Sequence, residues 1–316
     1  LRFYRLGGLF IIQFVFKIIN HHFIMKNLVI ILMLAFCCNC LADNNQPAHV
    51  IITAGQSNTD GRVPNDRLPD YIKAMSTDTA FTTGAYKYCK IAQNRTDGKF
   101  RPFWPKSKRR AKPHTWGYDA ITYYWLEQLW QEPFYVIKWA IGGTSIEPSA
   151  SSDKSVHWSA NPEWLSGNVA TSQKGRSLLL SFINDIDGCI DNTLSKLKNG
   201  YRIDAFLWHQ GESDRAYGDK YYENLKAVVA YVRNHLSEKT GEDYSKLPFI
   251  FGTVAKKNKQ YGSEVEEAMK RLAKEDKNAY LIDMSDAELM GDRLHFNQNS
   301  AEYLGKQMYE QIKKLR

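Results

Sequence analysis

Cysteine is scarce in this chain, which has only five among its 316 residues. Three of them, at positions 37, 38 and 40, fall within the first 42 residues. The other two, Cys89 and Cys189, are too few for a disulfide framework or a metal cluster. They could form a single bridge, but burial as free thiols is the interpretation we favour, because unpaired cysteine behaves as a small apolar side chain.

The sequence also lacks the motifs that hold a metal ion or a nucleotide. No grouping of histidine or cysteine has the spacing of metal ligands, and no glycine-rich loop of the phosphate-binding type occurs. We therefore expect no metal and no cofactor. Any chemistry would then depend on the protein's own side chains.

A long hydrophobic run is missing as well. The apolar stretch 28–36 is shorter than the roughly 20 residues that a transmembrane helix needs. It follows Met25 and Lys26, and small and then polar residues come after it. This order predicts a signal peptide cleaved after Ala42. The cysteines at the end of the stretch leave a lipid anchor open as an alternative.

Two parts of the chain therefore have different expected roles. Residues 1–42 are interpreted as an N-terminal extension plus signal peptide, with translation starting at Met25. Residues 43–316 are expected to form a single domain without a membrane span. The protein would be exported, either to the periplasm or to the extracellular space.

Charge of one sign is not in large excess. The formal net charge is +8, but residues 1–42 carry four basic side chains and no acidic one, which leaves 38 basic against 34 acidic, or +4. This balance is too mild to indicate nucleic-acid binding. The basic run 106–112 is typical of a solvated loop or of a contact with an acidic glycan. We expect no nucleic-acid partner.

Five apolar segments that alternate with helical patterns define the expected fold. The strands are predicted at 50–55, 134–140, 203–208, 248–254 and 279–283, and the helices at 116–130, 175–198, 219–235, 263–274 and 299–314. The segments 62–113 and 147–174 have no clear periodicity and are expected to be long connections. The alternation predicts an α/β fold, with a parallel sheet covered on both faces in a single domain.

Four polar clusters follow predicted strands. They lie at 56–58, 142–145, 209–214 and 292–295, the last in a loop. Because the carboxyl ends of parallel strands meet at one edge of the sheet, these clusters should converge although they are far apart in the sequence. Ligands of open α/β sheets bind at that edge, so the convergence predicts a functional site.

The residue types in these clusters suit ester hydrolysis by a serine. Ser57 is the candidate nucleophile, and Asp292 and His295, three residues apart, can place both side chains on the same side of a turn. His295 would take the serine proton while Asp292 orients the ring. Gly143 N–H, the Gln210 side-chain amide and Ser57 N–H would bind the oxyanion.

Each of these residues also has a simpler interpretation. Ser57 could cap the following helix, and a lone Asp-x-x-His is usually an ordinary turn. His209 is a rival base, but it alternates with Gln210 along the strand, and only one of the two can point into the site. Glu212 and Asp214 could replace Asp292 as the orienting acid, although bracing of their own loop is the interpretation we favour.

The four blocks together resemble one family. Gly55-Gln56-Ser57-Asn58, Gly142-Gly143-Thr144-Ser145, the run from Trp208 to Asp214, and Asp292-Arg293-Leu294-His295-Phe296 look like the SGNH-hydrolase superfamily, and most like its sialate O-acetylesterase and acetylxylan-esterase branch. The resemblance spans about residues 49–312. Thr59-Asp60 departs from it, because many relatives carry a Met-rich or small turn there.

This resemblance implies a flavodoxin-like, three-layer α/β/α fold around a five-stranded parallel sheet. It implies Ser57, Asp292 and His295 as the triad, and Gly143 and Gln210 as oxyanion donors. Gln56, Asn58 and Glu212 are interpreted as supporting residues of the same blocks.

The expected activity is removal of acetyl groups from an acetylated oligo- or polysaccharide, without a cofactor. Trp104, Trp158 and Trp164 lie in the polar connections, and stacking on sugar rings suits them better than an acyl tunnel does. Two alternatives stay open. One is an SGNH ester hydrolase for a lipid or thioester, and the other is a glycan-binding module that has lost catalysis.

Overall fold

The structure is a computed structural model, and it describes residues 46–75, 86–95, 97–105, 114–150, 156–170 and 177–316. The expected signal peptide, the cysteines of the alternative lipid anchor and the basic run 106–112 lie outside the described residues. Within the chain, Pro47–Arg316 form one compact unit.

A sheet of seven strands runs through this unit, in the order β4-β3-β6-β1-β7-β8-β9. At its centre, β1 (Ala48–Gly55) pairs in parallel with β6 (Phe134–Ala140) and β7 (Tyr201–His209). Beyond β7, β8 (Phe249–Gly252) and β9 (Ala279–Ile282) continue in parallel. The five strands predicted from the sequence are thus present, in the order of a flavodoxin-like sheet.

The expected count of five strands is nevertheless too low, because segment 62–113 adds two more. β3 (Cys89–Gln93) pairs in parallel with β6, and β4 (Arg101–Pro102) pairs antiparallel with β3 at the sheet edge. β3 is short and interrupts its apolar residues with Lys90, while β4 has only two residues, one of them a proline suited to an edge. Neither has a pattern that predicts a strand by itself.

The two segments expected to be irregular also contain other short elements. α5 (Pro162–Ala170) lies in segment 147–174. Between β1 and α4 the chain forms a separate two-stranded sheet of β2 with β5, together with a 3-10 turn and one helical turn. The elements are β2 (Val63–Pro64), η1 (Asn65–Arg67), α3 (Asp70–Lys73) and β5 (Thr115–Trp116). Elements this short carry too little periodicity to be recognised in sequence.

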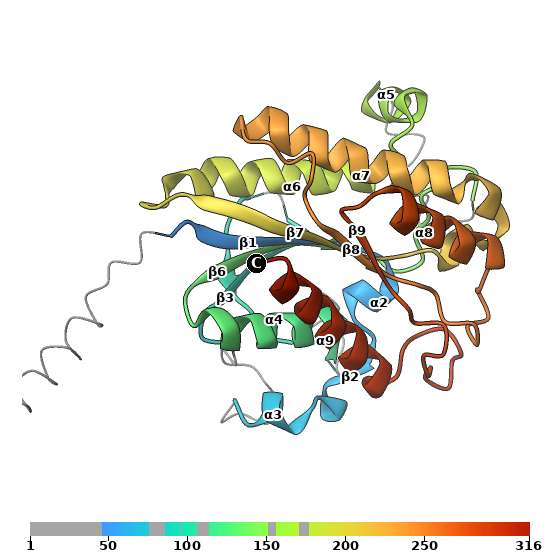
Figure 1. The fold of residues 1–316 in the computed structure, drawn as a ribbon, viewed down its shortest axis with the longest axis horizontal. Helices are drawn as coiled ribbons and strands as arrows, with labels where there is room; N and C mark the ends of the chain where they lie inside the picture. The colour runs from blue at the N-terminus through green and yellow to red at the C-terminus, as the bar shows by residue number, and fades with distance from the viewer. Residues whose placement is uncertain (1–45, 76–85, 96, 106–113, 151–155, 171–176) are drawn as a thin grey trace, which may run out of the picture. The chain divides into compact units, whose positions relative to one another are not determined.

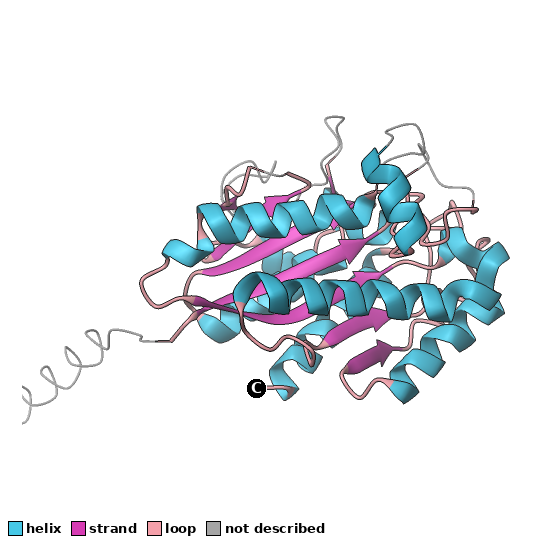
Figure 2. Cartoon of the chain, turned by 90° about the horizontal axis from the view of Figure 1, so that it is seen from above, coloured by secondary structure: helices cyan, strands magenta, loops and turns pink. Residues whose placement is uncertain are grey.

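Helices cover both faces of the main sheet and complete the three expected layers (Figure 1, Figure 2). Along β1, Val50 and Ile52 belong to a core cluster shared with α6, α7 and α8, while Ile51 belongs to a second cluster shared with α4 and α9. Successive side chains of a strand point to opposite faces, so both faces of β1 are buried. The helices are α4 (Tyr118–Trp130), α6 (Leu178–Asn192), α7 (Gly218–Thr240), α8 (Ser263–Glu275) and α9 (Gln298–Lys314).

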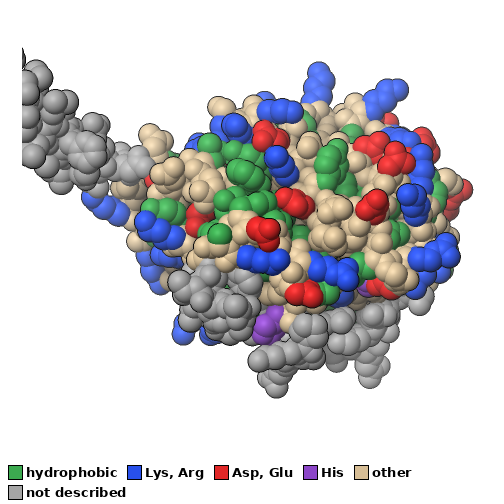
Figure 3. All heavy atoms as spheres, turned by 90° about the horizontal axis from the view of Figure 1, so that it is seen from below, with side chains coloured by type: hydrophobic (Ala, Val, Ile, Leu, Met, Phe, Trp, Pro, Cys, Tyr) green, Lys and Arg blue, Asp and Glu red, His purple; other side chains and the backbone are tan. Residues whose placement is uncertain are grey.

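Several expectations from composition can be compared with the described residues. Cys89 and Cys189 are buried free thiols, as favoured from the sequence. Within the described ranges, no three potential metal ligands gather in one place, and no helix has the length and apolar character needed to cross a membrane. On the face drawn in Figure 3, basic and acidic side chains are interspersed rather than separated by sign.

Candidate active site

Ser57 stands at the carboxyl end of the central strand. It is the first residue of the short helix α2 (Ser57–Asp60), which follows β1 directly and fits against β7 only because Gly55 has no side chain. A Cβ on Gly55 would lie 2.3 Å from the His209 carbonyl oxygen, and its φ of 146° also favours glycine. No side chain caps α2, and Gln56 occupies the capping position. The capping interpretation of Ser57 is therefore wrong.

Asp292 and His295 form a close pair in the loop between β9 and α9. The His295 Nδ1 and Asp292 Oδ2 atoms are 2.6 Å apart, and Asp292 Oδ1 accepts hydrogen bonds from the backbone N–H groups of Leu294 and His295. The His295 side chain is 15% exposed. One turn thus fixes the ring by Nδ1 and leaves Nε2 for another partner.

The electrostatics of this pair suit a base and its orienting acid. Burial lowers the pKa of His295 below its ordinary 6.5 and outweighs the raising effect of Asp292. Burial alone would raise the pKa of Asp292, but hydrogen bonds from the His295 backbone and ring and from Leu294 lower it on balance. At neutral pH the carboxylate is charged and the imidazole is neutral.

Asn58 joins the serine helix to the loop of the Asp-His pair. Its Oδ1 accepts a hydrogen bond of 3.1 Å from the Phe296 backbone N–H, and its Nδ2 donates one of 3.0 Å to Glu212 Oε1. The immediate neighbours of Ser57 and of His295 are therefore in direct contact, although about 240 residues separate them in sequence. Three predicted clusters meet here, at the carboxyl ends of β1, β7 and β9.

The fourth predicted cluster, which follows β6, contributes two glycines beside Ser57. Gly142 and Gly143 form a turn directly after β6, and Gly143 has a φ of 71° that a side chain would strain. A Cβ built on Gly142 would lie 3.2 Å from the Ser57 Cβ. The backbone of this turn thus lies against the serine, where an oxyanion donor is expected.

Gln210 does not offer its amide to the site, contrary to the prediction. The side chain is wholly buried, and its Nε2 donates to the Thr144 carbonyl oxygen at 3.0 Å and to Asp214 Oδ2 at 2.6 Å. Its Oε1 accepts from the Tyr221 hydroxyl. Because both amide N–H groups are engaged, Gln210 ties the turn after β6 to the segment after β7. Sequence alone could not tell which way the amide turns.

The other acids and the rival base have structural positions. Asp214 accepts hydrogen bonds from the backbone N–H groups of Ile146 and Glu147, and burial raises its pKa to about 6. It braces its neighbouring loop. Glu212 begins the 3-10 turn η5 (Glu212–Tyr217) and is 1% exposed, with Oε2 lacking a partner among the described residues.

His209, the rival base, is buried at the end of β7. Its Nε2 is 3.3 Å from the Thr253 carbonyl oxygen, and its ring meets the Phe296 ring edge to face at 4.9 Å. Nδ1 lies 3.8 Å from Glu212 Oε1 and has no hydrogen-bond partner among the described residues. The side chain is 1% exposed, which favours His295 as the base.

Arg62 is a residue of this site that sequence reasoning missed. It follows α2 and donates through Nη1 to Asp60 Oδ2 at 2.6 Å and to the Gly61 carbonyl oxygen at 2.8 Å. Its Nη2 would lie 2.3 Å from a Cβ on Gly142. The only signal in the sequence was its place five residues after Ser57, at the start of a segment that shows no periodicity.

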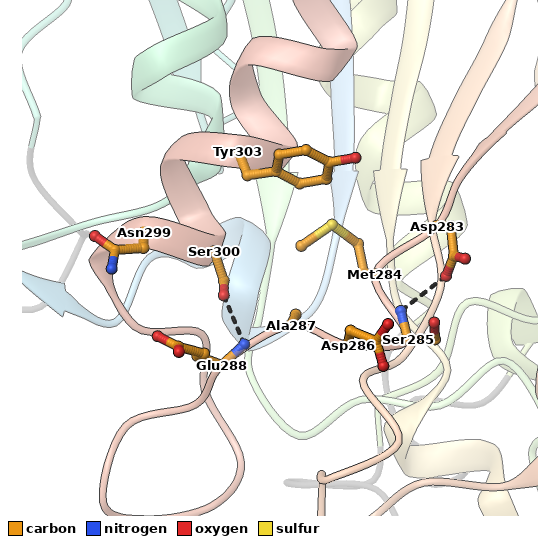
Figure 4. A pocket seen from close by; sticks show the side chains of 9 residues that line it. All are labelled: Asp283, Met284, Ser285, Asp286, Ala287, Glu288, Asn299, Ser300 and Tyr303. Atoms are coloured by element: carbon orange, nitrogen blue, oxygen red, sulfur yellow. Dashed lines mark hydrogen bonds between the residues drawn. The ribbon is translucent and has the colours of Figure 1, made fainter.

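Two pockets open on the surface of the described part of the chain. One, of about 620 Å³, is lined by α5, the start of α7 and the loop after β6, and includes Glu147, Trp164 and Asn224. The other, of about 500 Å³, lies between the loop after β9 and the start of α9, and Figure 4 shows Tyr303 above Met284 there. No candidate catalytic residue lines either pocket.

The three tryptophans of the long connections have different positions. Trp158 is fully buried and packs against Trp208 in the core, so it is unable to stack on a sugar from outside. Trp104 is partly buried against the core cluster that the sheet shares with α4 and α9. Trp164 lines the pocket of about 620 Å³ and fits the expectation best.

A parallel flavodoxin-like sheet with a serine after its first strand and an Asp-x-x-His before its last helix defines the class of this protein as an SGNH-type hydrolase. The family model described as "Carbohydrate esterase, sialic acid-specific acetylesterase" matches residues 47–314. The chain belongs to this carbohydrate esterase family, and it is a hydrolase acting on ester bonds.

Solved structures share the fold at low sequence identity. A protein from Arabidopsis thaliana is 19% identical, with a TM-score of 0.58, over 85% of this chain and 98% of its own. A carbohydrate acetylesterase from Xanthomonas citri is 14% identical, with a TM-score of 0.51, over 82% of this chain and 54% of its own. Comparison with curated proteins gave no match.

Proposed function

We propose that this protein is a carbohydrate O-acetylesterase that works through Ser57, His295 and Asp292. The observation that best supports the proposal is the contact made by Asn58, which holds the serine helix against the loop of the Asp-His pair. A serine nucleophile needs a neutral base, and the lowered pKa of His295 supplies one at neutral pH.

The proposed reaction has two similar halves. His295 Nε2 takes the Ser57 hydroxyl proton as Oγ attacks the carbonyl carbon of the acetyl group, and Asp292 stabilises the imidazolium that forms. His295 then gives the proton to the departing sugar oxygen, which leaves an acetyl-serine. Water attacks this ester with His295 as base, and acetate departs. The carbonyl oxygen is negatively charged in both tetrahedral intermediates, and the N–H groups of Ser57 and Gly143 are the proposed backbone donors.

The proposed substrate is an acetylated oligo- or polysaccharide, and no cofactor is needed. The pocket beside the loop after β6 supports this choice, because it combines the flat face of Trp164 with carboxylate and amide side chains. Its residue Glu147 is only four positions from Gly143. A sugar chain lying there would be close to the segment that carries the proposed oxyanion donor. Nucleic acid is not a proposed partner.

Export is part of the same proposal. Residues 1–42 would direct secretion and be removed, and residues 43–316 would be the esterase domain. Both the family match and β1 begin after position 42. Polymeric glycans are found outside the cytoplasm, so an exported enzyme would meet its substrate there.

Ser57→Ala tests the mechanism directly. Because the Ser57 hydroxyl makes no hydrogen bond to another described residue, its loss should leave thermal unfolding unchanged and reduce acetate release at least 10³-fold. Ser195→Ala, on the exposed turn η4 (Leu194–Lys196), is the matched control and should keep wild-type activity. Wild-type rates of acetate release by Ser57→Ala from an acetylated glycan or an aryl acetate would refute the mechanism.

A series of aryl esters separates the proposal from its alternatives. We expect the highest kcat/KM for acetyl and a steep fall as the acyl chain lengthens, together with acetate release from acetylated glycans. A preference for long acyl chains would indicate a lipid or thioester substrate. Tight glycan binding with no hydrolysis of any ester would indicate a binding module that has lost catalysis.

A further inference from the structure

Arg62 has a position that its role as an ion-pair partner does not explain. The side chain is 10% exposed, and both of the hydrogen bonds it makes to described residues come from Nη1, to Asp60 and to the Gly61 carbonyl oxygen. Within the described part of the chain, Nη2 donates to no acceptor. The guanidinium is thus anchored on one side and carries an unused donor on the other.

The unused donor lies beside the proposed nucleophile. A Cβ on Gly142 would be 2.3 Å from Arg62 Nη2 and 3.2 Å from Ser57 Cβ. Arg62 Nη2 and Ser57 Cβ are therefore no farther apart than the sum of these two distances. Arg62 also acts electrostatically on His295 and lowers its pKa, although less than burial does. Nη2 therefore borders the small volume beside Ser57 and Gly142. Only a glycine at position 142 leaves room for the guanidinium.

That volume lacks the side-chain donor expected from the sequence. Both N–H groups of the Gln210 amide are bound to Thr144 and Asp214, so Gln210 is unable to stabilise charge that develops on the substrate. A guanidinium is a stronger donor than an amide to a negatively charged oxygen. Because Asp60 already balances the resting charge of Arg62, the cation can be held at low exposure before substrate binds.

We propose that Arg62 is a catalytic residue of the esterase, whose Nη2 donates a hydrogen bond to the acyl carbonyl oxygen as that oxygen becomes an oxyanion. This inference rests on the proposed function and adds a charged donor to the N–H groups of Ser57 and Gly143. Arg62 keeps its proton throughout. The serine proton moves to His295, and the electron pair of the carbonyl goes to the oxygen that Arg62 and the backbone donors hold.

The test compares Arg62→Gln with wild type on a neutral ester, 4-nitrophenyl acetate. Removal of one oxyanion donor should lower kcat/KM about 10²- to 10³-fold. Arg67→Gln, on the exposed turn η1, is the matched control and should stay within about twofold of wild type. Covalent labelling of Ser57 by a neutral fluorophosphonate, followed by mass spectrometry, should slow in parallel, because the phosphoryl oxygen occupies the same place.

The pH profile tests separately whether the Arg62 charge acts on the His295 ring, while the loss of kcat/KM on the neutral ester tests the donor role. The charged groups that act on the His295 ring are Asp292, Glu212 and Arg62. Loss of the positive charge should move the acid limb of kcat/KM to higher pH in Arg62→Gln, while Arg67→Gln leaves it in place. If Arg62→Gln fails to fold, the pair Asp60→Asn and Asp60→Asn/Arg62→Gln repeats the comparison without an unpaired carboxylate.

Two results would overturn the inference and are distinguishable from failure of the proposed function. If Arg62→Gln keeps wild-type kcat/KM on the neutral ester and has a raised KM only for acidic sugars, Arg62 would be an anchor for a substrate carboxylate. Unchanged kcat/KM on all esters would limit it to its ion pair with Asp60. A wild type that neither hydrolyses the ester nor is labelled at Ser57 would instead refute the proposed function, and this inference with it.

Discussion

Individual side chains of the site are held by contacts that also set their charge. The His295 ring receives opposing influences, because burial and the Arg62 charge lower its pKa while Asp292 and Glu212 raise it. Burial is the largest of these influences, so the ring stays neutral in the resting enzyme. Asp292 keeps its charge because three N–H groups point at its carboxylate.

The first prediction concerns the pH dependence of catalysis. Since the pKa of His295 lies below its ordinary 6.5, the base is active at neutral pH and is lost as pH falls through the lowered value. We expect the acid limb of kcat/KM for the free enzyme to have its midpoint below pH 6.5. Stopped-time assays from pH 4 to 8 with a neutral aryl acetate would measure it. A midpoint above 6.5 would contradict the proposed environment of His295.

A second residue-scale prediction concerns stability. Asp185 on α6 is fully buried, its Oδ2 lacks a partner among the described residues, and burial raises its pKa to about 7. A raised pKa means that the folded protein binds the proton more tightly than the unfolded chain. The stabilising contribution is full below the unfolded value near 3.8 and disappears as pH rises towards 7.

Asp185→Asn removes this pH dependence, because the amide is neutral throughout. The variant should be more stable than wild type above pH 7, by up to about 4 kcal/mol in unfolding free energy, and similar to wild type near pH 4. Urea unfolding at the two pH values measures the difference. Asp191→Asn, an exposed site, is the control and should show no such gain. Equal gains at both pH values would mean that Asp185 is not protonated in the folded state.

At the scale of elements, the site depends on how short segments meet rather than on any single helix. Asn58 is the described link between α2 and the loop after β9, and it also reaches the segment after β7 through Glu212. Both of its partners are buried. A buried group that loses its hydrogen bond costs about 1–3 kcal/mol.

Asn58→Leu is therefore expected to be harmful in two ways. It should lower the free energy of unfolding by about 2–4 kcal/mol, and it should reduce kcat by at least tenfold because the Asp-His loop loses its attachment to the serine helix. Thermal unfolding and aryl acetate kinetics would measure both. Gln128→Leu, on the exposed face of α4, is the control. Normal kcat in Asn58→Leu would show that the loop is held by other contacts.

The elements that sequence predicted well are those with a strong repeating pattern. β1 and β6 are mainly apolar and buried along almost their whole length, and β7 is buried from Ala205 onward. α6 has an apolar stripe of three- and four-residue spacing. By contrast, β3 and α5 are short and mixed in composition. Their conformation depends on neighbours, here pairing with β6 in the case of β3.

The sequence predicted which segments meet at the site, because the ends of parallel strands determine that. A parallel sheet brings Ser57, the turn after β6 and the segment after β7 to one edge, whatever their distance in sequence. Side-chain direction was not predictable. The Gln210 amide donates to Thr144 on a distant segment as well as to Asp214. Arg62 is held by its neighbours Asp60 and Gly61 and lies against Gly142, a contact that only the fold creates. No local pattern encodes such choices.

At the scale of the whole molecule, every residue of the proposed mechanism lies after position 42. β1 begins at Ala48 and the family match at residue 47, so both begin after the segment that we propose directs export. The segment 25–42 has the order of a charged start, an apolar stretch and a small-residue exit. Such an order is typical of a signal peptide, so we propose that the segment directs export.

This division predicts the fate of the full sequence in a Gram-negative host. Expressed from Met25, the protein should appear in the periplasm with a mature N-terminus at Asp43, as measured by intact mass and N-terminal sequencing. Leu32→Arg places a charge in the apolar stretch and should keep the chain in the cytoplasm, while aryl acetate hydrolysis in the lysate persists because the catalytic domain is unchanged. A mature chain that begins at Cys37, Cys38 or Cys40 and carries fatty acid would show a lipid anchor instead. Retention of the uncleaved wild-type chain in the cytoplasm would refute export.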